Sequence, residues 1–221
     1  ILIHTSGAGV LTDDSTCRGD APESDRHALV WDDADHLRHA AIQDHAPHRR
    51  VDLEVFSAAK SGHIKTYLVV PPTVFGQGIG PLAKHRVSIQ IPRLIYQTLI
   101  SRKAMYVGTG ENVWPNIHVA DLAELYLLIL DGALNDSAPE GLAGIYYPVT
   151  EHFRWADVSH RIAQTLYKKS LLSSEVATTG LRSGWFWGSN VQVKSSNAEK
   201  LGWRPTHGGT DAMLNYIETD F

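Results

Sequence analysis

The sequence predicts an α/β fold built on a parallel sheet. Two short apolar segments, Ile1–Thr5 and Ile64–Val70, each end at a turn signal, which is typical of buried parallel strands. An amphipathic helix is predicted between them at His48–Lys60, because its apolar residues fall on one face. Asp121–Ala133 shows the clearest helical period in the chain. Alternation of strands and helices in this way favours parallel strand pairing.

The composition is that of an ordinary globular chain. Of 221 residues, 43% are hydrophobic and 20% are charged, which excludes collagen-like, coiled-coil and disordered classes. A formal net charge of -4 argues against nucleic acid or an anionic membrane as the main partner. Cys17 is the single cysteine, so no disulfide framework forms within the chain, and a reducing, cytoplasmic location is expected. No apolar run approaches the roughly 18–20 residues of a membrane span.

The N-terminal part has two unusual features. The chain opens inside a predicted buried strand, without an initiator Met or a signal-like segment, so we expect it to be an N-terminally truncated part of a longer parent. Between Thr12 and His48, nine acidic residues and five histidines predict a surface excursion with one short helix near Ala34–Gln43.

The remaining elements follow in chain order. Further helices are predicted at Val87–Arg102, Trp155–Tyr167, Ser195–Lys200 and Thr210–Thr219. Further strands are predicted at Ala104–Val107 and Ile145–Val149. Loops are predicted at Gly76–Pro81 and Ser170–Gly188.

Several common motifs are missing from the sequence. None of the 18 glycines falls in G-x-G-x-x-G or G-x-x-G-x-x-G, the turn that cradles a dinucleotide pyrophosphate. G-x-x-x-x-G-K-[ST], G-x-S-x-G and H-E-x-x-H are also missing. P-loop NTPase, α/β-hydrolase and zincin functions are therefore excluded.

Four segments, taken in order, resemble those of the extended short-chain dehydrogenases/reductases. They are similar to the strand end that carries the active-site hydroxyl, the R-P-x-x-V-[YF]-G segment, the [VIF]-H-V-x-D-[LV]-A segment and the K-A-x-x-x-L-G-[WF]-x-P ending. In this chain they are Ile3–Val10, Val70–Gly76, Trp114–Ala123 and Lys194–Pro205. NAD-dependent epimerase/dehydratase-like and NmrA-like proteins look closest.

The resemblance implies a fold, a cofactor and a reaction. The fold would be the C-terminal part of a Rossmann-like doubly wound parallel sheet with a small α/β substrate-side lobe. Residues 1–80 and 111–150 would form the Rossmann-like part, and residues 81–110 and 151–221 the lobe. The parent would be an NAD(P)-dependent oxidoreductase or epimerase that acts on a carbonyl or secondary alcohol. NAD and NADP stay open, because the residues that discriminate between them would lie upstream of this chain.

The catalytic residues depart from the family pattern. The family's active-site hydroxyl would be supplied by Ser6 or Thr5, although Ser6 could equally satisfy the backbone of its own turn. No tyrosine is followed four residues later by lysine, so the general acid/base pair Tyr-x-x-x-Lys is missing. The helix expected to carry it offers His45, His48 and two arginines, and a histidine could exchange protons near neutral pH.

Other site residues follow from the resemblance alone. Pro71 and Val74 would contact the nicotinamide, unless Pro71 simply ends its strand. Trp114, His118 and Trp185 would line a substrate pocket; the alternatives are a buried histidine bonded to backbone and aromatic residues of a core or interface.

The sequence also bears on metal binding, on alternatives to catalysis and on oligomeric state. Pairs at His36/His39 and His45/His48 could hold a metal, but no third ligand is suitably spaced, so no metal site is predicted. Loss of Tyr-x-x-x-Lys leaves open a catalytically silent, NmrA-like dinucleotide sensor, or a fragment that binds no cofactor on its own. The resemblance also implies a homodimer through Asp32–Lys60.

Overall fold

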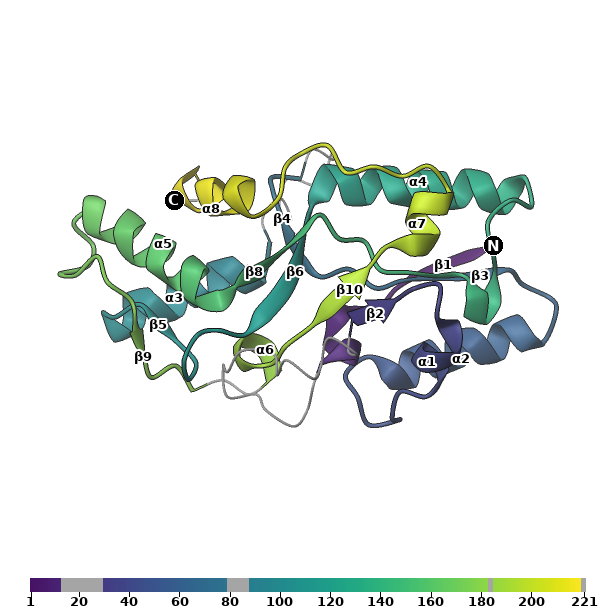
Figure 1. Ribbon diagram of the computed structural model, residues 1–221, viewed down its shortest axis with the longest axis horizontal. Coiled ribbons are helices and arrows are strands. Elements are labelled where there is room, and N and C mark those ends of the chain that lie inside the picture. The colour runs from purple at the N-terminus through teal and green to yellow at the C-terminus, as the bar shows by residue number, and fades with distance from the viewer. Residues whose placement is uncertain (13–29, 79–87, 183–184, 220–221) are drawn as a thin grey trace.

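The structure is a computed structural model that describes residues 1–12, 30–78, 88–182 and 185–219 (Figure 1). Its strands are β1 (Leu2–Thr5), β2 (Val30–Asp32), β3 (Thr66–Val69), β4 (Thr73–Phe75), β5 (Met105–Tyr106), β6 (Val113–His118), β7 (Ile145–Tyr146), β8 (Glu151–Arg154), β9 (Thr178–Thr179) and β10 (Gln192–Lys194). Its α-helices are α1 (His36–Ala40), α2 (Arg49–Lys60), α3 (Gln90–Ser101), α4 (Val119–Leu134), α5 (Trp155–Lys168), α6 (Trp185–Gly188), α7 (Ser196–Lys200) and α8 (Thr210–Thr219). Two 3₁₀ turns are η1 (Ala8–Leu11) and η4 (Gly141–Ala143).

The first sheet confirms the predicted parallel arrangement. Its strand order is β1-β3-β7, and both neighbouring pairs are parallel. The register aligns Ile3 with Tyr67 and Leu68 with Ile145. All residues of β3 are buried, as expected for a central strand covered on both faces.

Helices cover both faces of this sheet. Figure 1 shows α4 on one side of β1 and β3, and α1 and α2 on the other. Leu68 of β3 lies in the same core as Phe56 of α2. Its neighbours Tyr67 and Val69 point the opposite way, into the core that contains Leu125 of α4. This double covering gives the α/β, Rossmann-like class that the sequence predicts.

The second sheet was not predicted from the sequence. Its strand order is β4-β6-β8, with β4 parallel and β8 antiparallel to β6. Pro115 lies inside β6, and a proline within a segment argues against a central strand because it lacks a backbone N–H. The two sheets are linked directly, since only three residues separate the end of β3 from the start of β4.

The segment between Thr12 and His48 corrects one expectation. Residues 13–29, which include Cys17, lie outside the described residues. Beyond them the chain does not stay on the surface, because β2 pairs in parallel with β10. Asp33 is buried and accepts hydrogen bonds from the backbone N–H groups of Tyr147 and Asn197. An acidic residue enters the interior here because two donors satisfy its oxygens.

The predicted helices are confirmed with small changes in their bounds: four are shorter than expected, α4 and α5 are longer, and α8 has the predicted bounds. The segment expected at Val87–Arg102 forms α3, and the predicted loop at Ser170–Gly188 contains β9 and α6. The short strand expected in the smaller lobe is β5, which pairs with β9. Residues 79–81 of the predicted glycine-rich loop lie outside the described residues. The proposed division into two lobes stays a prediction. One hydrophobic core contains residues of both proposed lobes.

The helices also bear on membrane association. Within the ranges that the structure describes, no helix is both long and apolar enough to cross a membrane.

Candidate functional site

Ser6 and Asp52 form a buried polar pair where β1 ends. The backbone N–H of Ser6 donates to the carbonyl of Val69, which fixes the turn beside the end of β3. The Ser6 hydroxyl donates to Oδ2 of Asp52 at 2.9 Å. Asp52 lies in the first turn of α2 and is fully buried. The carboxyl end of a parallel strand thus meets an acidic helix start, a place where ligands bind in α/β sheets.

The environment of Asp52 raises the pKa of its carboxyl group. Burial is the main cause, and it is offset in part by the Ser6 hydrogen bond and by the positive potentials of His4, His48 and Arg49. Oδ1 lies 3.9 Å from Nε2 of His4 and has no hydrogen-bond partner among the described residues. A buried carboxyl with a raised pKa holds a proton nearer to neutral pH, which suits acid/base chemistry.

His48 lies next to this pair at the start of α2. Its backbone is left-handed, with φ of 66°, and it serves as the N-cap residue without a side-chain capping bond. Its ring lies against Gly7: a Cβ atom added to Gly7 would be 2.8 Å from His48 Nε2. Strained, non-glycine backbone is more frequent at functional sites than elsewhere. The glycine therefore lets an exposed imidazole approach the Ser6 turn.

The sequence contained a signal for this group that was missed. His48 and Asp52 are spaced i, i+4 at the start of α2, the spacing of the missing Tyr-x-x-x-Lys pair. Residues at this spacing share a helix face. The sequence singles out His48 as a residue that could exchange protons, but nothing in it marks Asp52 as buried.

The two candidate hydroxyls separate in the structure. The hydroxyl of Thr5 is hydrogen-bonded to the phenol of Tyr126 on α4, while that of Ser6 reaches α2. Consecutive residues of a strand point to opposite faces, which explains the divergence. Of the two, Ser6 is the hydroxyl that bonds to Asp52, next to the His48 ring.

Pro71 lies beside the Ser6 turn, and Val74 lies three residues further along the chain. The carbonyl of Pro71 accepts a hydrogen bond from the backbone N–H of Ala8, two residues after Ser6. Val74 lines a cavity of about 360 Å³ with Pro72 and Phe186, at the N-terminus of α3. The structure therefore ties Pro71 to the turn that follows Ser6, whereas Val74 belongs to a cavity lined by other elements.

The three residues expected in a substrate pocket have different surroundings. Trp114 is buried in the core, and its indole N–H donates to the carbonyl of Ser189 at 2.9 Å. His118 ends β6 at the carboxyl edge and its Nδ1 accepts from the N–H of Ala120 at 3.2 Å, which caps α4. Trp185 is the first residue of α6, and its side chain lies outside what the structure describes.

His118 also belongs to a polar cluster with His207 and Asp121. The two imidazole rings stack with centroids 4.7 Å apart. Nδ1 of His207 lies 2.6 Å from Oδ1 of Asp121, whose carboxylate also accepts the backbone N–H groups of Thr206 and His207. Burial lowers the pKa of His118, and the hydrogen bond to Asp121 raises that of His207. The cluster fastens the C-terminal segment to the start of α4.

The histidine pairs considered for metal binding do not converge in the described ranges. His39 points into the core, where its Nδ1 lies 2.6 Å from the hydroxyl of Tyr147. No group of three metal-ligating side chains was found among the residues that the structure describes.

Comparison with known proteins identifies the sequence pattern. Residues 45–141 match the NAD dependent epimerase/dehydratase family. The oxidase ucsJ of Acremonium sp is 26% identical over 227 residues, which cover 92% of this chain and 64% of the oxidase. The uncharacterized protein C2A9.02 of Schizosaccharomyces pombe is 28% identical over 73% of this chain and 51% of its own length. The chain thus spans about half to two thirds of these relatives.

Solved structures agree with the fold. UDP-glucose 4-epimerase from Thermotoga maritima, solved with UDP-glucose, superposes with a TM-score of 0.61 at 13% identity, covering 99% of this chain and 63% of the epimerase. UDP-glucuronic acid 4-epimerase from Bacillus cereus, in complex with UDP-glucuronic acid and NAD, gives a TM-score of 0.57 at 19% identity, covering 99% and 62%. DesIV of Streptomyces venezuelae, a dTDP-glucose 4,6-dehydratase with NAD bound, superposes with a TM-score of 0.60 at 14% identity. The superposition covers 97% of this chain and 58% of DesIV.

Proposed function

We propose that this chain, whose residues 45–141 match the NAD dependent epimerase/dehydratase family, acts on a carbonyl or secondary alcohol with an altered acid/base group. Ser6 would contact the substrate oxygen, with His48 at the position of the tyrosine and Asp52 at the position of the lysine. The observation that carries this proposal is the Ser6–Asp52 hydrogen bond beside the His48 ring.

The residues present fit the nicotinamide end of an NAD-type cofactor. Pro71, which is hydrogen-bonded to the turn after Ser6, and Val74, which lines the 360 Å³ cavity, would form the apolar wall against the ring. The glycine-rich phosphate turn is not in the sequence, so these residues account for one end of the dinucleotide. When bound, the cofactor supplies hydride transfer, and the protein manages orientation and the proton.

The proton route uses side chains of this chain alone. In the direction of alcohol oxidation, Ser6 Oγ accepts the proton of the substrate hydroxyl while its own proton passes to Oδ2 of Asp52. The raised pKa of Asp52 favours this transfer. His48 is exposed, so its imidazole exchanges protons between the turn and solvent.

Further contacts of the substrate would come from the opposite wall. His118 would contribute its ring at the carboxyl edge of β6, and Trp185 stays a proposed pocket residue from the sequence alone. Trp114 would support this wall from inside the core. Thr5 would hold β1 against Tyr126 and so position Ser6.

A turnover screen with paired variants tests the proposal. NADH and NADPH are each supplied with a series of aldehydes and ketones, and NAD and NADP are each supplied with secondary alcohols, including a nucleotide sugar of the kind bound by the similar epimerases. Ser6→Ala and Asp52→Asn should each lower kcat by about 10²–10⁴-fold, the usual worth of general acid/base catalysis. Ser61→Ala, at the other end of α2 and exposed, is the matched control and should leave kcat unchanged. Thr5→Ala should lower kcat less than Ser6→Ala; equal losses would reject the assignment of Ser6.

One observation favours a second candidate, a dinucleotide-binding sensor without catalysis. A carboxylate stands at the fourth position after His48, where the related oxidoreductases carry lysine. Calorimetric titration with NAD(H) and NADP(H) separates the candidates: binding without turnover of any carbonyl supports the sensor. Failure of this 221-residue chain to bind either dinucleotide would support the third alternative, a fragment without cofactor binding of its own.

The wider setting is part of the same proposal. We expect a cytoplasmic protein whose active form is a homodimer that pairs through Asp32–Lys60, and a longer parent chain that supplies the phosphate-binding turn. Light scattering on the purified chain and on the longer parent tests the dimer in both.

A further inference from the structure

A second cavity lies beside α2, away from Asp52. It has a volume of about 400 Å³ and is bordered by α2, the end of α1 and η4. On α2 its lining residues Arg49, Leu53, Phe56 and Lys60 recur at i, i+4, i+7 and i+11, which makes them one helix face. Asp52 is not among them, so the cavity and the Ser6–Asp52 pair lie on different faces of the helix.

Arg49 is an unusual component of this cavity. Its side chain is 2% exposed, and Nη2 donates to the carbonyl of Ala40 at 2.8 Å. Nε and Nη1 have no hydrogen-bond partner among the described residues, which leaves three N–H donors unsatisfied. The carboxyl group of Asp52 interacts with this charge through space but makes no hydrogen bond to it. A buried guanidinium whose N–H donors lack partners is costly, because nothing replaces its hydration. An anionic group bound in the cavity would reduce this cost.

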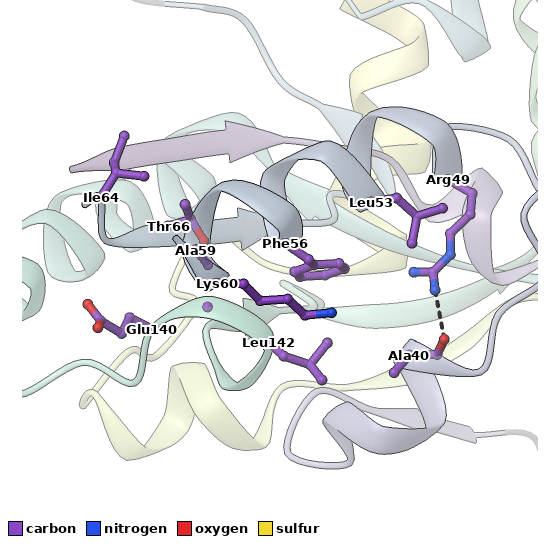
Figure 2. A pocket seen from close by; sticks show the side chains of 11 residues that line it. Ala40, Arg49, Leu53, Phe56, Ala59, Lys60, Ile64, Thr66, Glu140 and Leu142 are labelled. Carbon is purple, nitrogen blue, oxygen red and sulfur yellow. Dashed lines mark hydrogen bonds between the residues drawn. The ribbon is translucent and has the colours of Figure 1, made fainter. Parts of the chain in front are cut away.

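The other walls define what kind of anion would fit. Figure 2 shows the guanidinium of Arg49 and the ammonium of Lys60 turned toward the same space, between Phe56 and Leu142. Leu53 completes the apolar surroundings near Arg49, whereas the carboxylate of Glu140 borders the far end of the cavity. The cavity therefore has two cations at one end, an acid at the other and apolar walls between them. Such a lining suits a ligand that carries a single negative charge on an apolar body.

We propose that this cavity binds a small monocarboxylate with an alkyl or aryl body, whose carboxylate pairs with Arg49 and Lys60. Arginine's planar fork matches a carboxylate in a bidentate geometry. The volume is at the small end of the range for ligand sites. A doubly charged phosphate fits less well. It would lose its strong hydration without gaining polar contacts from the apolar walls, and the carboxylate of Glu140 would repel it. This site is independent of the proposed oxidoreductase activity.

Binding of hexanoate and benzoate to the wild-type chain, followed by calorimetry and protein NMR, tests the proposal. Hexanamide and benzamide serve as neutral analogues, and inorganic phosphate serves as the anion without an apolar body. We expect millimolar or tighter binding of the carboxylates, with intermolecular NOEs from the ligand to the ring of Phe56. The amides should bind about tenfold to a hundredfold more weakly, the worth of a charge-assisted hydrogen bond.

Two variants and a matched control locate the site. Arg49→Met keeps the length and apolar stem of the side chain and should weaken hexanoate by about tenfold or more. Leu142→Trp leaves both cations in place and should abolish binding by filling the cavity. Arg50→Met removes the neighbouring exposed arginine, which does not line the cavity, and should leave affinity unchanged. Circular dichroism checks that each variant is folded.

Several results would overturn the proposal. One is a folded wild-type chain that binds neither carboxylate at millimolar concentrations, or that binds them without contact to Phe56. Equal binding of acid and amide would remove the role of Arg49, and preference for inorganic phosphate would reject the apolar body. Because the NOE and amide comparisons use only the wild-type chain, the proposal stays falsifiable even when a variant fails to fold.

Discussion

Ser6 and Asp52, 46 positions apart in the sequence, share a buried hydrogen bond of 2.9 Å between Oγ and Oδ2. The bond joins the end of β1 to the first turn of α2, and it is the only hydrogen bond found for the Asp52 carboxyl group in the described part of the chain. Its energetic weight is therefore measurable independently of catalysis.

Ser6→Ala should destabilise the protein more at alkaline than at acidic pH. The Ser6 hydrogen bond lowers the pKa of Asp52, which burial has raised. Since a raised folded-state pKa means stability is lost as pH rises, removing the hydroxyl should increase that loss. We expect a cost of about 1–3 kcal/mol at pH 8 by urea denaturation, and less at pH 4. In an Asp52→Asn background the pH dependence of this cost should vanish. If it persisted, the effect of Ser6 on stability would not act through the protonation of Asp52.

His39 should make stability fall on acidification. Burial, with a contribution from Arg49, lowers its pKa from 6.5 to about 3. A lowered histidine pKa gives stability that is present above pH 6.5 and is lost as pH falls toward 3, because the unfolded chain takes up the proton first. Relative to His39→Gln, the wild-type free energy of unfolding should fall by up to about 1.4 kcal/mol per pH unit below pH 6. A constant difference between the two proteins would contradict this expectation.

Asp33 provides the opposite control. Burial raises its pKa to about 7, so its contribution to stability is lost as pH rises from about 4 to 7. Relative to Asp33→Asn, the wild-type free energy of unfolding should therefore fall over that interval with increasing pH. Both residues bond to Tyr147, one to its hydroxyl and one to its backbone N–H. Over the shared interval the wild-type profile should be flatter than that of either variant.

The sequence predicted the central parallel sheet well because its signals are local. β1 and β3 are short apolar runs closed by turn residues, and α2 has a clear apolar face. Strands β4, β6 and β8 were missed because their order depends on pairing between distant segments, and β6 contains Pro115. Tertiary pairing overrides local propensity in such strands.

The candidate site was predictable only in part. The hydroxyl at Ser6 followed from the resemblance, and the apolar pair Pro71 and Val74 followed from its proline-rich segment. The partner of Ser6 could not be derived, since a buried acid in a first helical turn has the same sequence signature as an exposed one. Arg49 was similarly ambiguous: Arg50 has the same side chain, and only the packing of α2 buries the former and exposes the latter.

Gly76 should tolerate no side chain. Its φ is +93°, and an added Cβ would lie 2.2 Å from Nε2 of His118. We expect Gly76→Ala to cost about 2 kcal/mol or more in thermal or urea unfolding, from backbone strain and displacement of the ring. Gly62→Ala is the matched control, because φ is +72° but nothing lies within 4 Å of the added atom. It should cost about 1 kcal/mol. Equal costs for Gly76→Ala and Gly62→Ala would show that the His118 ring moves aside without a measurable loss of stability.

Asp121 should stabilise the fold through backbone donors and at the same time set the protonation of His207. An asparagine offers one acceptor oxygen where the carboxylate offers two, so the N–H of either Thr206 or His207 loses its partner. Asp121→Asn should therefore cost about 1–3 kcal/mol in urea unfolding.

The same substitution should lower the pKa of His207, followed by NMR of its imidazole protons, because the hydrogen bond to Asp121 is the main cause of its raised value. Glu124→Gln removes a nearby exposed carboxylate that raises this pKa less, and it is the matched control. If both substitutions shifted the pKa equally, the short contact between His207 and Asp121 would not persist in solution. The indole N–H of Trp203, which donates to the backbone carbonyl of Asp121 at 2.9 Å, does not depend on the carboxylate and should be kept in both variants.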